Sequence, residues 1–386
     1  MDIVIGIIIG IIVLTLLVVV HELGHALVAK KHGVVVQEFG VGFPPKAWSR
    51  TVPKSILGEN VEYSVNWLPL GGFVKLQGEH DAARKKGDYG AVTFWQKTQI
   101  LLAGVAMNWL TAAILLASLA YVGMPVIVQD QFRVESDTQI IRQPVELVAV
   151  SPGLPAEEAG LRQGDKILKV NGSALEDASA LSDITLQYKG KEIDILYSRN
   201  NIEYTTTVKP RASNEDNRGY IGASPAQQDL LRSTWSAPIV GIGTTIQMSV
   251  ITIQGIGDLL ANTLQGLVMK VSFNQDDRNR ADEKLAEVGD SVAGPVGIFG
   301  IIFPAAGKAG LMHVVMLAAI ISLTLAVMNI LPIPALDGGR WFVTALFRVF
   351  RRPLGKDLEE KIHGTGFMIL MGLVLLITIA DIGKFR

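Results

Sequence analysis

Four stretches of the sequence are apolar and long enough to cross a bilayer or nearly so. They are Ile3–Ala29, Ile100–Val122, His313–Leu331 and Phe367–Ala380. A fifth stretch, Ala237–Met269, is apolar but interrupted by Thr, Gln, Asn and Asp residues, so we interpret it as an amphipathic helix or pair of helices lying at the membrane interface. The pattern predicts a multi-pass α-helical membrane protein with about four transmembrane helices.

Composition agrees with this pattern and narrows the function. Hydrophobic residues make up 49% of the 386 residues, a high share for a soluble protein, which points to several membrane spans and a water-soluble part. The formal net charge of −1 gives no indication of a nucleic-acid partner. The sequence contains no cysteine, so disulfides and thiolate metal sites are excluded.

Basic residues are concentrated in two connecting loops. By the positive-inside rule both loops belong on the cytoplasmic side of the plasma membrane. Both chain termini and residues 123–312 then lie on the outer side. This arrangement needs an even number of spans, so a fifth span at 237–269 would contradict it. The loop between the first two spans contains Lys30, Lys31, Lys46, Arg50, Lys54, Lys75, Arg84, Lys85, Lys86 and Lys97. The connection between the last two contains Arg340, Arg348, Arg351, Arg352, Lys356 and Lys361.

The first basic loop contains a segment with strand periodicity. Residues Val61–Trp67 alternate with period two, Leu68–Gly72 has the composition of a turn, and Phe73–Leu76 reads as a second strand. We expect a membrane-associated β-hairpin over about residues 60–78. Its bare edge either packs against the spans or pairs with an extended peptide by strand addition. In the second case the residues expected to contact substrate include Val65, Trp67, Gly71 and Gly72.

Residues from about 127 to 211 have the pattern of a water-soluble α+β insert. Strands are expected at Leu147–Val150 and Asp165–Val170, and a hairpin at Glu192–Tyr197 and Ile202–Lys209. The run Ser151–Asp165, followed by an Asn-Gly turn, resembles the PDZ domains of bacterial membrane and periplasmic proteases, which commonly bind chain termini or extended peptides. The expected organisation is a first transmembrane pair with the β-loop (1–126), an extracytoplasmic PDZ domain (127–211), an extracytoplasmic linker with the amphipathic segment (212–311) and a second transmembrane pair (312–386).

A candidate metal site lies at the end of the first apolar run. His21 and His25 are four residues apart and therefore share one face of a helix, where two imidazoles can bind one Zn²⁺ ion. Glu22 lies one step around the helix, close enough to act on a water without being a ligand. The alternative is a helix end with two polar histidines. Ionisable groups at membrane depth are expensive and usually functional, which favours the metal site.

A catalytic zinc site needs a third protein ligand, and Asp337 is the candidate. It follows Pro332 and Pro334, which prevent a regular helix, and precedes two glycines at the start of a new helix. The alternative is that Asp337 only caps the N-terminus of that helix and binds no metal. The expected topology favours the ligand, because the first and third spans both run inward and bring the two motifs to one depth.

Together these motifs resemble the site-2 protease family. The resemblance is carried by H-E-x-x-H in the first span, N-x-x-P-x-P-x-L-D-G-G from Asn329 onward, a β-loop between the first two spans and an outer PDZ insert. It is similar to the bacterial regulator-of-sigma-E protease branch with a single PDZ domain. Two departures are Val105, where many relatives have proline, and Thr324, where relatives often have asparagine.

The resemblance implies an intramembrane zinc metalloprotease that cuts the transmembrane segment of single-span substrates, generally after a first protease has removed the outer domain. It implies His21, His25 and Asp337 as zinc ligands, Glu22 as the catalytic base and Asn329 as a substrate-holding residue. The lipid bilayer and, at the PDZ domain, a peptide or chain terminus are the other expected partners. The active site is expected near the cytoplasmic side of the plasma membrane.

Two other functions are compatible with parts of the sequence. One is a membrane-tethered PDZ adaptor with a non-catalytic metal site, against which the intact Glu22 and Asp337 argue. The other is a zinc peptidase for soluble substrates that is merely anchored in the membrane. It disagrees with the position of the motif inside an apolar segment. The other histidines have no partner at metal-binding spacing and are interpreted as surface or packing residues; they are His32, His80, His313 and His363.

Overall fold

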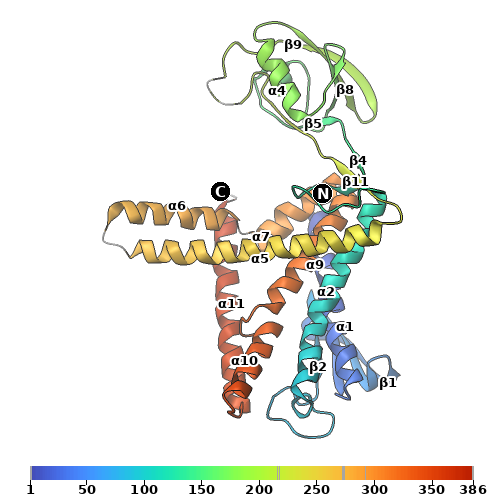
Figure 1. Ribbon diagram of the computed structural model, residues 1–386, viewed down its shortest axis with the longest axis vertical. Coiled ribbons are helices and arrows are strands. Elements are labelled where there is room, and N and C mark those ends of the chain that lie inside the picture. Colours follow the sequence, from blue (N-terminus) through green and yellow to red (C-terminus); the bar gives the residue numbers. More distant parts are fainter. Residues whose placement is uncertain (1, 215, 217, 272–273, 292, 385–386) are drawn as a thin grey trace. The chain divides into compact units, whose positions relative to one another are not determined.

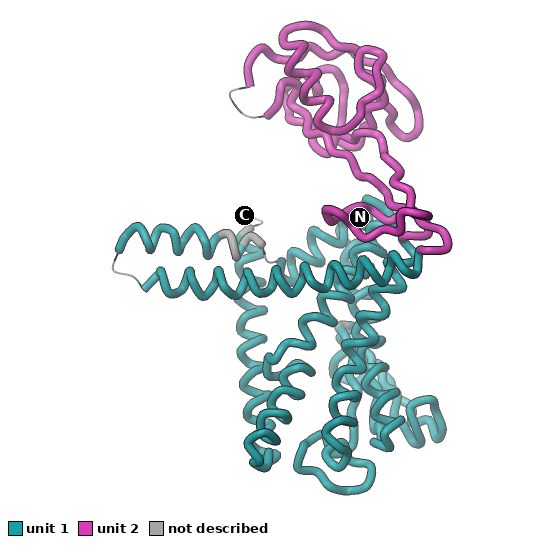
Figure 2. Tube along the Cα trace, in the orientation of Figure 1, with its two compact units in different colours: residues 1–119, 237–386 teal, residues 120–236 magenta. Residues whose placement is uncertain are grey.

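The computed structural model describes residues 2–214, 216, 218–271, 274–291 and 293–384. The chain forms two compact units (Figure 2), one of residues 1–119 and 237–386 and the other of residues 120–236. The first, which we call the helical unit, contains the long apolar helices. The second, which we call the insert unit, contains most of the short strands of Figure 1.

Among its described residues, the helical unit contains five helices that are long and apolar enough to cross a membrane. Such helices satisfy every backbone polar group internally, which is the condition for crossing hydrocarbon. Two of them, which begin at Phe94 and Lys356, start earlier than the hydropathy indicates, because the polar turns that precede the apolar stretches are also helical. The five are α1 (Asp2–Lys31), α2 (Phe94–Val122), α5 (Ala237–Lys270), α9 (Leu311–Ile330) and α11 (Lys356–Lys384).

Helix α5 differs from the other four in direction. In Figure 1 it runs across the direction of α2 and α11. Its first half packs on α2, where a Cβ at Gly241 would lie 2.6 Å from that of Ala117. Its second half pairs with α6 (Gln275–Ser291), and an ion pair joins Lys270 to Asp282.

Shorter elements complete the helical unit. A segment of consecutive short helices packs along α1, where a Cβ at Gly6 would approach Pro304 to 2.6 Å. The short helices are η1 (Tyr89–Ala91), α7 (Pro295–Gly297), the π-helical η2 (Ile298–Ile302), α8 (Phe303–Ala309) and α10 (Asp337–Val349).

The β-loop has a different strand order from the one that its periodicity suggests. It consists of two long bent strands, β1 (Val36–Ser55) and β2 (Gly58–Leu76), that turn at residues 55–58. Residues 36–41 pair on one side with 61–65 and on the other with 72–76, while 48–55 pair with 58–65. The predicted direct hairpin between Val61–Trp67 and Phe73–Leu76 is therefore wrong, because residues 36–41, which look like a loop in the sequence, form the strand between them.

This order decides which edge of the β-loop is free. Residues 62–65 are paired on both sides, so their backbone is used within the sheet, and the two outer strands are 48–55 and 72–76. Residues 72–76 pair with β1 on one side only, and on their other edge the N–H of Val74 donates to Oε2 of Glu22 on α1 at 3.1 Å. Of the two outer strands, residues 72–76 are the ones beside Glu22, so strand addition next to this motif would use them rather than 61–67.

The insert unit is built on an antiparallel sheet in the order β10-β5-β6-β8-β9, with β7 beside β6. The predicted hairpin of β8 and β9 is confirmed, with Ile193 opposite Val208 and Arg199 opposite Ile202. A second, three-stranded sheet has the order β3-β11-β4. The elements are β3 (Met124–Pro125), β4 (Gln139–Ile141), β5 (Val145–Val150), α3 (Pro155–Glu158), β6 (Lys166–Val170), β7 (Ser173–Ala174), α4 (Ala178–Gln187), β8 (Ile193–Arg199), β9 (Ile202–Val208), β10 (Ala223–Ala226) and β11 (Leu230–Arg232).

A buried carboxylate joins β6 to β8 in this unit. Asp165 is 1% exposed, and both of its oxygens accept hydrogen bonds from Arg199, from Nε and from Nη2, each at 2.7 Å. The backbone N–H of Arg162 also donates to Asp165, at 2.7 Å. A forked arginine fits both carboxylate oxygens at once, which is why such a pair withstands burial.

Arg199→Ala should destabilise the insert unit by about 3 kcal/mol, because it leaves a buried carboxylate without its counter-ion. The measurement is amide hydrogen exchange of β6 and β8 in the full chain. Arg162→Ala is the matched control, since only the backbone of that residue contacts Asp165, and it should change the free energy of opening by less than about 0.5 kcal/mol. Equal exchange in the two variants would contradict a structural role for the ion pair.

Candidate metal centre

The two histidines of the H-E-x-x-H motif face α2 from one side of α1. Both are buried, at 7% exposure each, and their Nε2 atoms are 3.1 Å apart. The helices approach closely here because glycines replace side chains. A Cβ at Gly24 would lie 2.6 Å from the carbonyl oxygen of Ala103, and one at Gly104 would lie 2.7 Å from Cε1 of both His21 and His25. Gly104 therefore leaves the space that the two rings fill.

The outer nitrogens of both rings have polar neighbours on α2. His25 Nδ1 donates a hydrogen bond to the carbonyl oxygen of Ile100 at 2.8 Å, which leaves the lone pair of its Nε2 facing the cluster. The side-chain amide of Asn108 lies 3.4 Å from His21 Nδ1. Contacts of this kind fix the orientation of metal-binding histidines.

Asp337, which is far from the two histidines in the sequence, completes the cluster. Its Oδ2 lies 3.0 Å from His21 Nε2 and 3.2 Å from His25 Nε2. It is the first residue of α10, and Leu336 occupies the N-cap position without a side-chain hydrogen bond. The capping alternative is therefore wrong, because the carboxylate points to the histidines and not to the helix backbone.

The donor set fits a zinc ion. The nitrogen and oxygen atoms of His21, His25 and Asp337 all lie within 4.8 Å of one another. His25 Nε2, with a proton on the other nitrogen, lies 3.2 Å from the Asp337 carboxylate, a distance that a proton or a metal cation between them would explain. Two neutral imidazoles and one carboxylate are a frequent catalytic zinc set, which keeps a fourth position open.

Glu22 lies beside this cluster without joining it. Its Oε2 accepts a hydrogen bond of 3.1 Å from the backbone N–H of Val74, on the free edge of the β-loop. Glu22, His25 and Asp337 line one cavity of about 230 Å³. The further lining residues are Phe73, Val74, Leu76, Glu79, Tyr89, Ile100, Leu101 and Arg340. The motif glutamate can therefore reach a water at the cluster without being one of the three donors.

The residues predicted to contact substrate lie in three places. Gly71 and Gly72 are buried against α1, and a Cβ at Gly71 would be 3.5 Å from Cγ1 of Val18. Val65, 46% exposed, lies in the doubly paired part of β2, and Trp67, 70% exposed, follows that part; neither belongs to the outer strand 72–76. Asn329 is half-buried in the last turn of α9, without a side-chain hydrogen bond in the described part of the chain.

Sequence analysis alone overlooked two polar residues beside the cluster. Asn108 was visible as an asparagine in an apolar span, a feature that usually marks function, but nothing in its spacing connects it to His21. His363 was interpreted as a surface or packing residue. In the structure its Nδ1 accepts a hydrogen bond of 3.2 Å from the backbone N–H of Ala335, two residues before Asp337.

Comparisons with known proteins agree with this centre. The profile of Peptidase family M50 matches residues 9–373. A protein of Clostridium perfringens that is named as a zinc metalloprotease is 32% identical over 366 residues, 95% of each chain. The zinc metalloprotease RasP of Geobacillus kaustophilus is 25% identical, and the regulator of sigma-W protease RasP of Bacillus subtilis is 24% identical, each over 97% of both chains.

Among solved structures, the PDZ domain of an SdrC-like protein from Listeria monocytogenes matches 22% of this chain and 92% of its own length, at 22% identity. The TM-score of 0.21 does not establish the fold of the insert unit, whose PDZ assignment stays a prediction. The family profile covers nearly the whole chain, and one relative exceeds 30% identity over 95% of it. The chain therefore belongs to peptidase family M50, which confirms its resemblance to the site-2 proteases, and it is a zinc metalloprotease.

Proposed function

We propose that this chain hydrolyses peptide bonds within the membrane-spanning segments of membrane-anchored proteins. The observation that carries the proposal is the position of the donor cluster: His21 and His25 lie on α1 directly after the apolar run Ile3–Val20. A peptidase for soluble substrates gains nothing from a metal centre within such a helix. The peptide bond that is cut must therefore come to the depth of this helix.

The roles of the site residues follow from their positions. Zinc, when held by His21, His25 and Asp337, would polarise the scissile carbonyl and lower the pKa of the attacking water. Glu22 takes the proton of that water, because its carboxylate opens into the cavity that His25 and Asp337 also line. The same carboxylate then delivers the proton to the nitrogen of the leaving amine.

The free edge of the β-loop supports substrate binding by strand addition. The N–H groups of Val74 and Leu76 donate to the carboxylates of Glu22 and Glu79, each at 3.1 Å. A helical substrate uses its carbonyls in its own hydrogen bonds, whereas a segment paired with this edge is extended beside Glu22. Such a segment would take over the N–H of Val74 and so release Glu22 for proton transfer.

The membrane arrangement that we propose has four spans, α1, α2, α9 and α11, with α5 at the outer interface. The basic loops then face the cytoplasm together with the metal centre, and the insert unit lies outside. The name of the Bacillus subtilis relative, regulator of sigma-W protease, supports membrane-anchored regulators of a sigma factor as one substrate class. Remnant signal peptides, which are also single apolar helices, are another.

Glu22→Gln should retain zinc and the fold but lose at least about a hundredfold in cleavage rate, because an amide cannot accept the proton of water. The measurements are zinc content and cleavage of a single-span substrate by the purified protein. This variant also separates the protease from a membrane-tethered PDZ adaptor, whose function would survive the change. Cleavage near the wild-type rate would remove Glu22 from the role of base.

Asp337→Asn should weaken zinc binding by at least about tenfold, since an uncharged amide is a poor replacement for a carboxylate donor. Competition with a chelator measures the affinity. Asp177→Asn is the matched control, because Asp177 does cap a helix, accepting from the N–H of Ala180 at 2.9 Å, and asparagine caps equally well. Equal zinc affinity in both variants would argue against Asp337 as a ligand.

Val74→Pro should reduce cleavage about tenfold or more while the zinc content is kept, because proline removes the outward N–H that would pair with substrate. Val74→Ala keeps this N–H and should be much milder. Val65→Pro is the comparison on the doubly paired part of β2. Because strands lie on both sides of Val65, a proline there disrupts the sheet, and the thermal stability of this variant should fall. If the cleavage rate falls in proportion to thermal stability in all three variants, residues 72–76 have a structural role and do not pair with substrate.

A further inference from the structure

The loop that carries Asp337 contains an unfavourable backbone conformation. Ala335 has φ of +83°, a region that residues with a Cβ rarely adopt. Such a conformation persists where surrounding contacts hold it in place. Because Ala335 is two residues before Asp337, whatever holds this backbone also sets where the carboxylate points.

The other hydrogen bonds of the loop are local. The N–H of Ile333 donates to the carbonyl of Leu331 at 2.7 Å, and the N–H of Leu336 donates to that of Ile333 at 3.1 Å. At the start of α10 the N–H of Arg340 donates to the carbonyl of Leu336 at 2.9 Å. The N–H of Ala335 is the exception, since its acceptor is a side chain on α11, Nδ1 of His363 at 3.2 Å.

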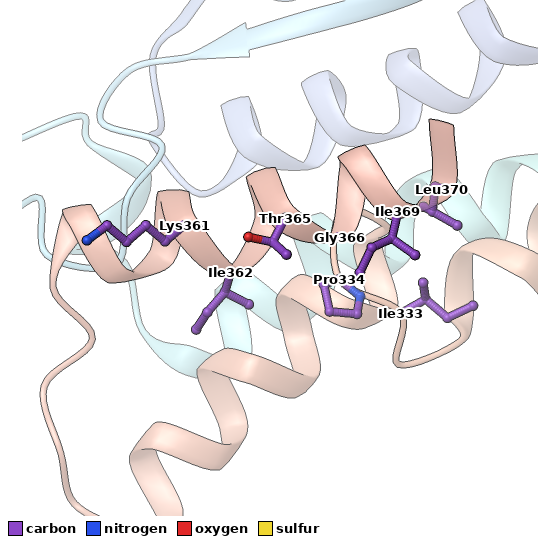
Figure 3. A pocket seen from close by; sticks show the side chains of 8 residues that line it. All are labelled: Ile333, Pro334, Lys361, Ile362, Thr365, Gly366, Ile369 and Leu370. Carbon is purple, nitrogen blue, oxygen red and sulfur yellow. The ribbon is translucent and has the colours of Figure 1, made fainter. Parts of the chain in front are cut away.

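Helix α11 packs tightly on this loop at one point and leaves a pocket beside that point. At Gly366 the contact is tight, because a Cβ there would lie 2.6 Å from the carbonyl oxygen of Pro334. Beside it Ile333 and Pro334 of the loop and side chains of α11 line an apolar pocket of about 410 Å³ (Figure 3). Packing therefore covers only part of the loop, and the hydrogen bond of His363 is the polar contact that fixes its orientation.

We propose that His363 is a positioning residue for the zinc ligand Asp337. Its Nδ1, unprotonated and accepting, holds the N–H of Ala335 and thereby keeps the loop in the strained conformation that points Asp337 at His21 and His25. This inference rests on the proposed metal centre. It assigns to α11 a part in metal binding although that helix provides none of the three donors.

The test compares side chains that differ in where they place an acceptor. Asparagine has its Oδ1 where histidine has Nδ1, whereas glutamine places its amide farther out, near the position of Nε2. His363→Ala and His363→Gln should weaken zinc binding about tenfold or more, as is typical when a contact that orients a ligand is lost. His363→Asn should stay within about threefold of the wild type. Zinc dissociation constants come from chelator competition on the full chain in detergent.

A second change tests the strain directly. Glycine adopts positive φ without penalty, so Ala335→Gly in the His363→Ala background should recover most of the lost zinc affinity. If His363 has only a structural role, His363→Ala should lower the thermal stability of the protein, and adding Ala335→Gly should not restore zinc affinity. His313→Asn is the control histidine; its Nδ1 is buried without a hydrogen-bond partner among the described residues, and the change should leave zinc affinity unaltered.

The outcomes separate this inference from the proposed function. Wild-type affinity in His363→Gln, equal weakening in His363→Asn and His363→Ala, or no recovery with Ala335→Gly would each overturn the positioning role, while the metal centre stands. If His363→Ala does not fold, the comparison of the asparagine and glutamine variants decides the matter. A wild-type chain that binds no zinc would overturn both the proposed function and this inference.

Discussion

The convergence of three possible metal-binding atoms is the constraint on which the rest of the helical unit depends. His21 Nε2, His25 Nε2 and Asp337 Oδ2 lie about 3 Å apart in a buried place beside an apolar helix. Burying ionisable groups beside an apolar helix costs free energy unless a proton or a metal cation between them offsets it. The fold must therefore provide both the donors and the contacts that hold their outer sides. Ile100 and Asn108 on α2 and the loop of Asp337 supply these contacts.

Close helix packing makes the convergence possible. Between membrane helices packing is driven less by the hydrophobic effect than by van der Waals contact, so small residues mark the interfaces. Gly24 on α1 and Gly104 on α2 remove the side chains that would otherwise occupy the space of the two imidazole rings. Any larger residue at position 104 would have to displace His21 or His25, so this glycine belongs to the metal centre as much as to the packing.

Sequence analysis predicts features that depend on residues close together in the sequence and misses those that depend on residues far apart. His21, Glu22 and His25 are set by helical periodicity within one turn, so their common location was predictable. The strand order of the β-loop was not, because β1 and β2 bend and residues 36–41 pair on both sides, a non-local arrangement that alternation in 61–67 does not encode. His363 and Ala335 are 28 positions apart and belong to no spacing motif, so their hydrogen bond emerged only from the tertiary structure.

The contact between Glu22 and Val74 links binding to chemistry in the proposed mechanism. A carboxylate that accepts from a backbone N–H is held in place and has one oxygen engaged. Pairing of an extended substrate with residues 72–76 needs that same N–H, so the two cannot both have it. Glu22 is then freed only when a segment has been unwound along the edge beside the metal centre. A site arranged in this way would leave intact helices uncut, because a helix forms no strand pairing and does not displace the glutamate.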